Sequence, residues 1–374
     1  MTRRRYKKFD YHENSEEFSG LKVNEGIEQP PSINPGAVER FRKKRKKDYS
    51  REDYMRGIRG GDRTMLSQAI TLIESSLPEH NRLAQEIIED CLPFTGNSLR
   101  IGITGVPGVG KSSFIENLGK HVSDQGRKLA VLAIDPSSER TGGSILGDKT
   151  RMETLVNNPN CFIRPSPSAG SLGGVARKTR ESIVLCEAAG YNTIFIETVG
   201  VGQSETAVHS MVDFFLLLML GGAGDELQGI KRGIMEMADA IAITKADGDN
   251  IQRANIAKTE YKNALHLFPA QETGWYPKVL TCSSYKNTGI EDIWETIINH
   301  SDVLNRNHFF EKNRTDQARY WMYETINESL QKNFYNDPGI KSLIVDLEKK
   351  VLYKNLSSFE AARILLDKYY NPEG

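Results

Sequence analysis

The chain lacks the cysteine and histidine patterns by which disulfides or a bound metal stabilise a small fold. Its four cysteines, Cys91, Cys161, Cys186 and Cys282, lie far apart and form no Cys-x-x-Cys pair, and its seven histidines are scattered. A disulfide framework or a structural zinc site is therefore not expected, and a reducing compartment suits such a chain.

Long hydrophobic runs are also missing. The most apolar stretch, residues 214–220, is far too short to span a bilayer and suits a buried strand. The basic start, residues 1–8, is followed by acidic residues rather than by an apolar segment. Neither a secretory signal nor a mitochondrial presequence is predicted, so we expect a cytoplasmic protein without a membrane partner.

No charge of one sign is in excess, because Lys+Arg and Asp+Glu both number 49. The chain therefore has no net positive charge that would attract nucleic acid, and no nucleic-acid partner is predicted. The basic run 42–47 could bind nucleic acid or an acidic partner surface, but a solvated helix face explains it better. With 374 residues, 38% of them hydrophobic, the chain is long enough for one large domain with appendages or for two domains.

The first part of the chain divides into an arm and a helical extension. Residues 1–50 are polar and carry Pro30 and Pro31, which predicts a flexible or loosely docked arm. Residues 51–97 are expected to form helices, with Asp62 at an N-cap position and a second helix ending near Pro93. The apolar positions at helical spacing are Met65, Leu66, Ala69, Ile70 and Ile73, then Leu83, Ile87 and Ile88.

From Leu99 onward, short apolar runs alternate with glycine-rich turns and helical stretches. Continuous rather than alternating hydrophobicity indicates strands covered on both faces, which is typical of a mostly parallel α/β sheet flanked by helices. We assign this domain to residues 98–300. The runs are 101–104, 129–134, 194–196, 214–220, 240–243 and 278–281.

The tail, residues 301–374, is predicted to be a helical hairpin or small bundle. Its apolar stripes either pack back on the sheet or meet a second copy of the chain. A break at Asp337, Pro338 and Gly339 separates the first two helices, and a third helix is expected over 358–366. The stripes are Ala318, Met322, Ile326, Leu330 and Phe334, then Ile340, Ile344, Leu347 and Val351.

The strongest motif is Gly-x-x-x-x-Gly-Lys-Ser at residues 105–112, which follows a predicted strand and opens a helix. Glycines let successive backbone N–H groups point at phosphate oxygens, and the helix N-terminus adds partial positive charge. Lys111 would reach the β- and γ-phosphates of a nucleoside triphosphate, and the Ser112 hydroxyl could ligate Mg²⁺. The predicted phosphate-binding residues are Gly105, Val106, Pro107, Gly108, Val109, Gly110, Lys111, Ser112 and Ser113.

A phosphate loop of this kind needs carboxylates at the ends of neighbouring strands to hold Mg²⁺ and to sense the γ-phosphate. Asp135 ends the second strand, and Glu197 ends another in an Asp/Glu-x-x-Gly pattern. In that pattern the N–H of Gly200 can contact the γ-phosphate. Asp148 is a plausible third carboxylate, and Gln203 is a candidate for positioning the attacking water.

The choice of base is predicted from Thr-Lys-Ala-Asp at residues 244–247, placed at the end of a strand. The Asp247 carboxylate can accept from guanine N1–H and N2–H₂ together, a paired donor edge that adenine lacks. Lys245 would lay its apolar stem along the base. Thr244 replaces the usual Asn, which weakens one contact near guanine N7, and Ser283 with Ser284 resembles the last guanine-contact loop.

Eight segments combine these motifs: 61–63, 69–74, 102–112, 135–138, 141–152, 173–181, 197–205 and 224–231. Together they resemble the MeaB/ArgK branch of P-loop GTPases, the GTPase chaperones of adenosylcobalamin-dependent methylmalonyl-CoA mutase. The resemblance covers about residues 55–300 in detail. It departs from the family at Thr244 for Asn, at Ser284 for Ala, and in a longer N-terminal arm.

The resemblance implies slow, Mg²⁺-dependent hydrolysis of GTP to GDP that gates adenosylcobalamin loading or protection of a mutase. It further implies a homodimer built through the tail and methylmalonyl-CoA mutase or a related acyl-CoA mutase as partner, with a cobalamin adenosyltransferase as a further candidate partner. No cobalamin site is identified in this chain. Residues Asp225, Glu226, Gln228 and Lys231 would form a third switch that responds to the nucleotide.

Other interpretations stay open at this point. Arg177, Lys178 and Arg180 could stabilise phosphate charge or make cross-dimer contacts, and a solvated helix face explains them equally well. The functional alternatives are a nickel-type metallochaperone GTPase, a kinase-like ATPase of basic amino-acid transport, and a binding module with an inactive phosphate loop. The first would need clustered Cys or His ligands, and the second would need adenine selectivity.

Overall fold

The computed structural model describes residues 49–134, 152–165, 172–198, 204–222, 232–269 and 272–371. The chain divides into two units, Met1–Tyr49 and Ser50–Gly374, and all the helices and strands described belong to the second. The positions 135, 148, 200, 203, 225, 226, 228 and 231, to which the sequence assigns roles, lie outside the described residues.

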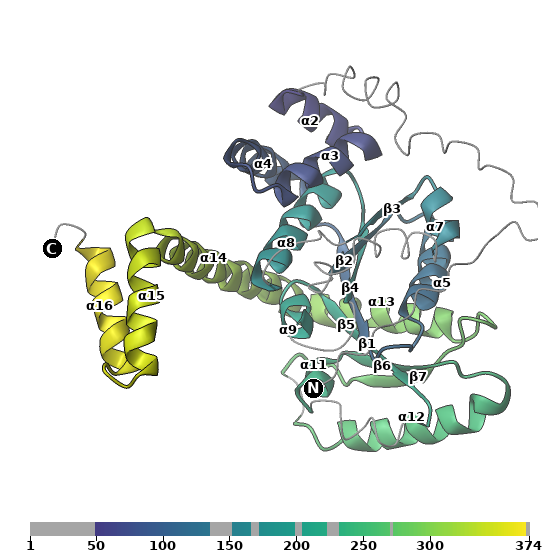
Figure 1. Cartoon of the computed structure of the whole chain (residues 1–374). Coiled ribbons are helices and arrows are strands. Elements are labelled where there is room, and N and C mark those ends of the chain that lie inside the picture. Colours follow the sequence, from purple (N-terminus) through teal and green to yellow (C-terminus); the bar gives the residue numbers. More distant parts are fainter. Residues whose placement is uncertain are drawn as a thin grey trace, which may run out of the picture. The chain divides into compact units, whose positions relative to one another are not determined.

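A parallel sheet forms the centre of the second unit (Figure 1). Its order is β3-β2-β4-β1-β5-β6-β7, and all six strands expected from the apolar runs are present. β3 was not predicted, because it has only four residues and one of them is an arginine. The bounds are β1 Leu99–Gly105, β2 Leu129–Ile134, β3 Cys161–Arg164, β4 Thr193–Thr198, β5 Phe214–Leu220, β6 Ala240–Thr244 and β7 Lys278–Thr281.

Helices cover both faces of the sheet, which confirms the α/β fold. α5 and α13 pack together on one face, and α8 and α9 lie on the other (Figure 1). Because parallel strands are joined by crossovers, the carboxyl ends of the strands share one edge, where ligands bind in open α/β sheets. The helices are α5 Lys111–Asp124, α7 Glu153–Asn157, α8 Leu172–Ala188, α9 Ser204–His209, α11 Arg232–Met237, α12 Ile251–Leu265 and α13 Ile290–Arg306.

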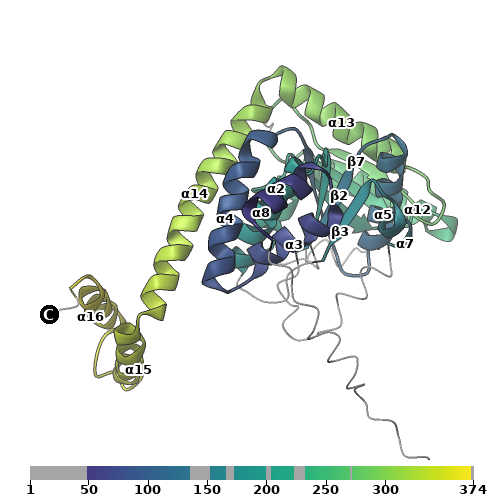
Figure 2. The same ribbon diagram turned by 90° about the horizontal axis from the view of Figure 1, so that it is seen from above.

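The helical extension ahead of the sheet is also present: α2 (Arg51–Arg59), α3 (Arg63–Glu74) and α4 (Pro78–Cys91) pack against α8 (Figure 2). Asp62 caps α3 as predicted, since its carboxylate accepts from the backbone N–H groups of Thr64 (2.8 Å) and Met65 (3.2 Å). Satisfying two of the free donors at a helix start is what makes Asp a favourable cap.

Three further helices follow α13: α14 (Phe309–Asn336), α15 (Pro338–Leu352) and α16 (Ser358–Tyr370). The predicted break is confirmed, because Asp337 ends α14 and caps α15 by accepting from the N–H of Ile340 at 3.0 Å. The predicted stripe on α14 does not pack on the sheet: Met322, Ile326 and Leu330 are 53%, 46% and 57% exposed. Among the described residues, no helix is both long and apolar enough to cross a membrane.

Candidate functional site

The phosphate loop lies between the carboxyl end of β1 and the start of α5, as the sequence predicts. Gly108 and Gly110 have φ angles of +77° and +92°, a conformation that only glycine adopts without strain. Gly105 lies so close to β5 that an added Cβ would stand 2.5 Å from the carbonyl oxygen of Leu218. Gly105 is therefore required by close packing, whereas Gly108 and Gly110 are required by their backbone conformation.

Lys111 points back along this loop. Its ammonium donates to the carbonyl of Gly105 at 2.8 Å and lies 3.5 Å from the carbonyl of Val106. Burial lowers the pKa of Lys111, and the charges of Glu197 and Glu205 oppose that effect. Among the described residues its hydrogen-bond partners are backbone carbonyls, and a partly desolvated ammonium forms a stronger hydrogen bond with a phosphate oxygen.

Glu197 lies on β4, paired with Ile103 of β1 and with Ala133 of β2, and is only 6% exposed. It stands at the same edge of the sheet as the phosphate loop. Glu205, in the first turn of α9, is 1% exposed and also acts on Lys111 through its charge. Glu205 was not predicted as a site residue from the sequence, although it is the last residue of the segment 197–205. The available signals were its carboxylate and its position five residues after Gly200.

The predicted guanine-contact residues meet on two neighbouring loops. One oxygen of the Asp247 carboxylate accepts a hydrogen bond from the Ser283 hydroxyl, which also accepts from the N–H of Lys286 at 3.0 Å. The other oxygen has no partner among the described residues. Lys245 adopts the left-handed conformation (φ 54°) and is exposed. The pair Asp247–Ser283 thus presents a fixed acceptor beside the phosphate loop.

Thr244, the departure from the usual Asn, has a structural role. It is 2% exposed, and its hydroxyl lies 2.8 Å from the carbonyl of Val109 and 3.2 Å from that of Met219. It therefore ties the phosphate loop to the strands that carry the guanine-contact residues. Ser284 is tied in as well, because its carbonyl accepts from the side-chain amide of Asn117 on α5.

The three basic residues of α8 are accounted for by packing. Lys178 donates to the carbonyl of Glu74 at 3.0 Å, and Arg180 stacks over the ring of Trp321 at 4.5 Å. Arg177 interacts with Glu181 and Glu328 through its charge. These contacts join α8 to α3 and α14, which makes the helix a packed element rather than a solvated face.

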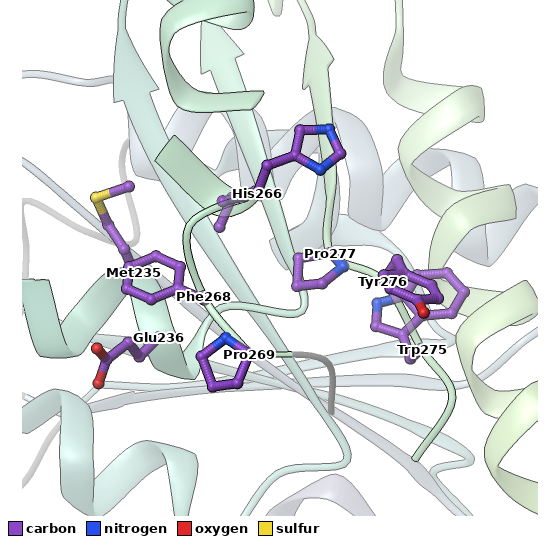
Figure 3. A pocket seen from close by; sticks show the side chains of 9 residues that line it. Met235, Glu236, His266, Phe268, Pro269, Trp275, Tyr276 and Pro277 are labelled. Carbon is purple, nitrogen blue, oxygen red and sulfur yellow. The ribbon is translucent and has the colours of Figure 1, made fainter. Parts of the chain in front are cut away.

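A separate hollow of about 430 Å³ lies near the amino ends of β6 and β7. Figure 3 shows Phe268 beside Met235 and Glu236 of α11 on one side of it, with Trp275 and Tyr276 on the opposite side. Because the phosphate loop follows the carboxyl end of β1, this hollow belongs to the other edge of the sheet. It is not the predicted nucleotide site.

With the fold and this geometry established, relationships to known proteins decide the family. Residues 66–338 match the family model described as "Methylmalonyl Co-A mutase-associated GTPase MeaB". The chain belongs to the MeaB family. As a member of a GTPase family with an intact phosphate loop, it is a P-loop GTPase, which confirms the resemblance expected from the sequence.

Individual MeaB relatives agree. The chain is 48% identical over 310 residues to "Probable GTPase Rv1496" of Mycobacterium tuberculosis (83% of this chain, 92% of that protein). It is 47% identical over 281 residues to "GTPase ArgK" of Escherichia coli (75% and 85%). It is 45% identical over 323 residues to "Methylmalonic aciduria type A homolog, mitochondrial" of Mus musculus (84% and 78%).

A solved structure supports the same MeaB-type fold. The crystal structure titled "LAO/AO transport system kinase" superposes with a TM-score of 0.69 at 36% identity, covering 85% of this chain and 96% of that one.

Proposed function

We propose that this MeaB-family protein binds GTP with Mg²⁺ and hydrolyses it slowly to GDP and phosphate, as a chaperone of an adenosylcobalamin-dependent acyl-CoA mutase. The observation that carries the proposal is the common edge of the sheet. It combines a phosphate loop with a lysine held by carbonyls and a carboxylate–serine pair that matches the guanine donor edge. GTP is the ligand that needs both.

Within this proposal the phosphate loop residues 105–113 bind the phosphates, and Lys111 neutralises the β- and γ-phosphates. The described oxygen donors suit Mg²⁺, since Ser112 lies in the first turn of α5 and Glu197 is a buried carboxylate at the adjoining strand end. Asp135 and Asp148 would complete the metal and switch acids. Bound Mg²⁺ would neutralise charge that develops on the phosphates.

The described residues near the phosphate loop support the proposed slow rate. Among the described residues of this edge, Lys111 is the cation whose position suits the γ-phosphate, and the arginines of α8 are engaged elsewhere. Without an arginine to stabilise the transition state, hydrolysis by P-loop GTPases is slow. Gln203 remains the proposed water-positioning residue, and Gly200 the proposed γ-phosphate contact.

The mutase partner is supported by the family's description and by the relatives named for methylmalonic aciduria type A. We propose that methylmalonyl-CoA mutase, or a related acyl-CoA mutase, prefers one nucleotide state, so that hydrolysis gates loading or protection of its cofactor. Such gating requires different affinities of the partner for the two states. The third switch, Asp225, Glu226, Gln228 and Lys231, would report the nucleotide to the mutase, and a cobalamin adenosyltransferase could supply the cofactor.

We also propose a homodimer through residues 301–374. The exposed apolar stripe on α14 and large exposed side chains such as Leu352 (80%) and Phe359 (87%) support it, because a monomer rarely leaves so much apolar surface in water. Residues 1–50 would be an arm, 51–97 a helical extension and 98–300 the GTPase domain.

The test measures GTP hydrolysis with and without purified methylmalonyl-CoA mutase at saturating partner. Stimulation by the mutase is expected for the wild type, and Lys111→Ala should lose hydrolysis in both conditions. Equal wild-type rates with and without the mutase would count against gating, while GTP hydrolysis itself would still stand.

The related structure is described as a transport-system kinase, which suggests an ATP-using kinase as a second candidate. Adenine offers no paired donor edge to the Asp247 carboxylate, so this candidate predicts that ATP displaces a fluorescent GTP analogue as well as GTP does. Preferential displacement by GTP would exclude it.

A further inference from the structure

α14 holds the segment that follows α9. Its contact residues Arg314, Gln317 and Trp321 are three and four positions apart, so they lie on one face of the helix. All three reach residues 210–213, the linker between α9 and β5. We call Arg314, Gln317 and Trp321 the α14 clamp and residues 210–213 the α9 linker.

Each clamp residue makes a directed polar contact. The Arg314 guanidinium donates to both oxygens of Asp213, at 2.9 and 2.7 Å, and the Asp213 side chain is only 2% exposed. The Gln317 amide donates to the carbonyl of Val212 at 2.7 Å, and the indole N–H of Trp321 donates to the carbonyl of Ser210 at 2.9 Å. Three of the four linker residues are therefore bound to one helix.

The clamp lies in a buried environment. Gln317 and Trp321 are 9% and 4% exposed, and Arg180 of α8 covers the Trp321 ring. Hydrogen bonds that are buried are expensive to break, because the freed groups would have no water to bond. The α9 linker and α14 should therefore move as one body rather than slide past each other.

Two more contacts connect α14 to α8 and to α15. Further along the helix, Glu328 lies against Gly173 in the first turn of α8, where an added Cβ would come within 2.1 Å of a carboxylate oxygen. At its far end α14 is joined to α15 by the single residue Asp337, which caps α15. A displacement of the clamped end therefore passes to α15 through a one-residue connection, and α16 packs against α15.

The position of α9 connects α14 to the predicted nucleotide site. α9 begins at Ser204, and Glu205 in its first turn acts electrostatically on Lys111 of the phosphate loop. α9 is only six residues long and ends at the clamped linker. A change at its first turn is thus transmitted over less than two helical turns to residues bound by α14.

We propose that the α14 clamp carries the nucleotide state from α9 to the C-terminal helices α15 and α16. This inference rests on the proposed function, because it requires that GTP and GDP bind at the phosphate loop. By linkage, whatever binds α15 and α16 preferentially in one state would change nucleotide affinity by the same factor.

The experiment is hydrogen exchange, followed by mass spectrometry, on the full chain with Mg²⁺ and either GDP or GTPγS. In the wild type, amides of the α9 linker and of α14 and α15 should exchange at rates that differ about fivefold between the nucleotides, the change that one hydrogen bond of average strength corresponds to. In Gln317→Met/Trp321→Phe, which loses two clamp donors, the difference in α15 should vanish while both nucleotides still protect the phosphate loop.

Two further variants keep the test clear. Trp321→Phe alone keeps an aromatic ring at this position but loses the N–H donor together with part of the indole, so it replaces the double variant if that variant unfolds at too low a temperature. Thr325→Val is the matched control, since its hydroxyl bonds only to the carbonyl of Trp321 within α14. This control should keep the full nucleotide-dependent difference.

The failures are distinguishable. Identical exchange of α14 and α15 in the two wild-type states, with the phosphate loop protected, would overturn the clamp and leave the GTPase intact. A difference in α15 that persists in the double variant would also overturn it. Absence of protection of the phosphate loop by either nucleotide would remove the proposed function, and this inference with it.

Discussion

Replacing Thr244 by valine tests how the phosphate loop is held in shape. Valine has the same shape as threonine and loses only the hydroxyl, which lies 2.8 Å from the carbonyl of Val109 and 3.2 Å from that of Met219. Thr244 is 2% exposed and Val109 is 1% exposed, so water cannot replace the lost donor. The carbonyl of Val109 is the one expected to move.

The size of the effect follows from this burial. Leaving a buried carbonyl without a partner costs about 1–3 kcal/mol. If the loop relaxes to recover a partner and must be restored when phosphate binds, the affinity for GDP should fall about 5- to 140-fold, because each 1.4 kcal/mol is tenfold. Thr244→Asn, whose amide can also donate, should bind GDP nearly as well as the wild type.

Titration calorimetry with Mg·GDP measures this loss, with a thermal melt on each variant. Thr193→Val is the matched control: Thr193 is fully buried at the amino end of β4, and its hydroxyl interacts with Arg127 at 3.4 Å. The control should change stability at most. Unchanged GDP affinity in Thr244→Val would refute the tether, as would an equal loss in Thr193→Val.

Three other predictions concern stability, strain and charge. Glu187→Ala should lower the free energy of unfolding by about 3–5 kcal/mol in chemical denaturation, because it leaves the part-buried guanidinium of Arg100, 2.9 Å from the carboxylate, without its charged partner. The control Gln85→Ala, at an exposed site, should change the free energy of unfolding little. Gly110→Ala should weaken GDP binding, because alanine at φ +92° adds backbone strain of about 1–2 kcal/mol. The space around the new methyl group is open, so a steric clash does not contribute. An unchanged affinity for GDP would contradict the strain. Burial lowers the pKa of Lys111 in the free protein, and a bound phosphate should raise that pKa again. GDP binding at alkaline pH should therefore take up protons, and the affinity for GDP should fall as the pH rises. Calorimetry in buffers of different ionisation enthalpy measures the proton uptake, and Lys111→Arg should show none.

Much of the fold could be predicted because its signals are local. Continuous apolar runs identify the buried strands β1, β2, β4, β5, β6 and β7, and the caps at Asp62 and Asp337 mark where helices begin. The phosphate loop was found from its spacing alone, since each glycine and the lysine serve one geometric need. Such motifs depend on neighbours in the sequence, and the sequence displays those directly.

The remainder depends on contacts between distant residues. β3 was missed because four residues carry too little pattern, and Glu205 because only the fold brings it to Lys111. The sequence suggested a weakened guanine contact at Thr244, whereas its tether to Val109 spans 135 positions. The side of α14 that contacts residues 210–213 was also hidden, because Arg314 and Gln317 are polar and the apolar stripe lies elsewhere on the helix.

The choice of base by Asp247 is the most direct test of the central claim. Xanthine carries an oxygen where guanine carries its amino group, so Asp247→Asn replaces an acceptor by a donor that fits xanthine. Competition between GTP and xanthosine triphosphate should show the wild type preferring GTP by at least about 100-fold, the value of two hydrogen bonds to a charged group, and the variant preferring xanthosine triphosphate. If Asp247→Asn binds GTP as tightly as the wild type does, guanine is not recognised there and the account is contradicted.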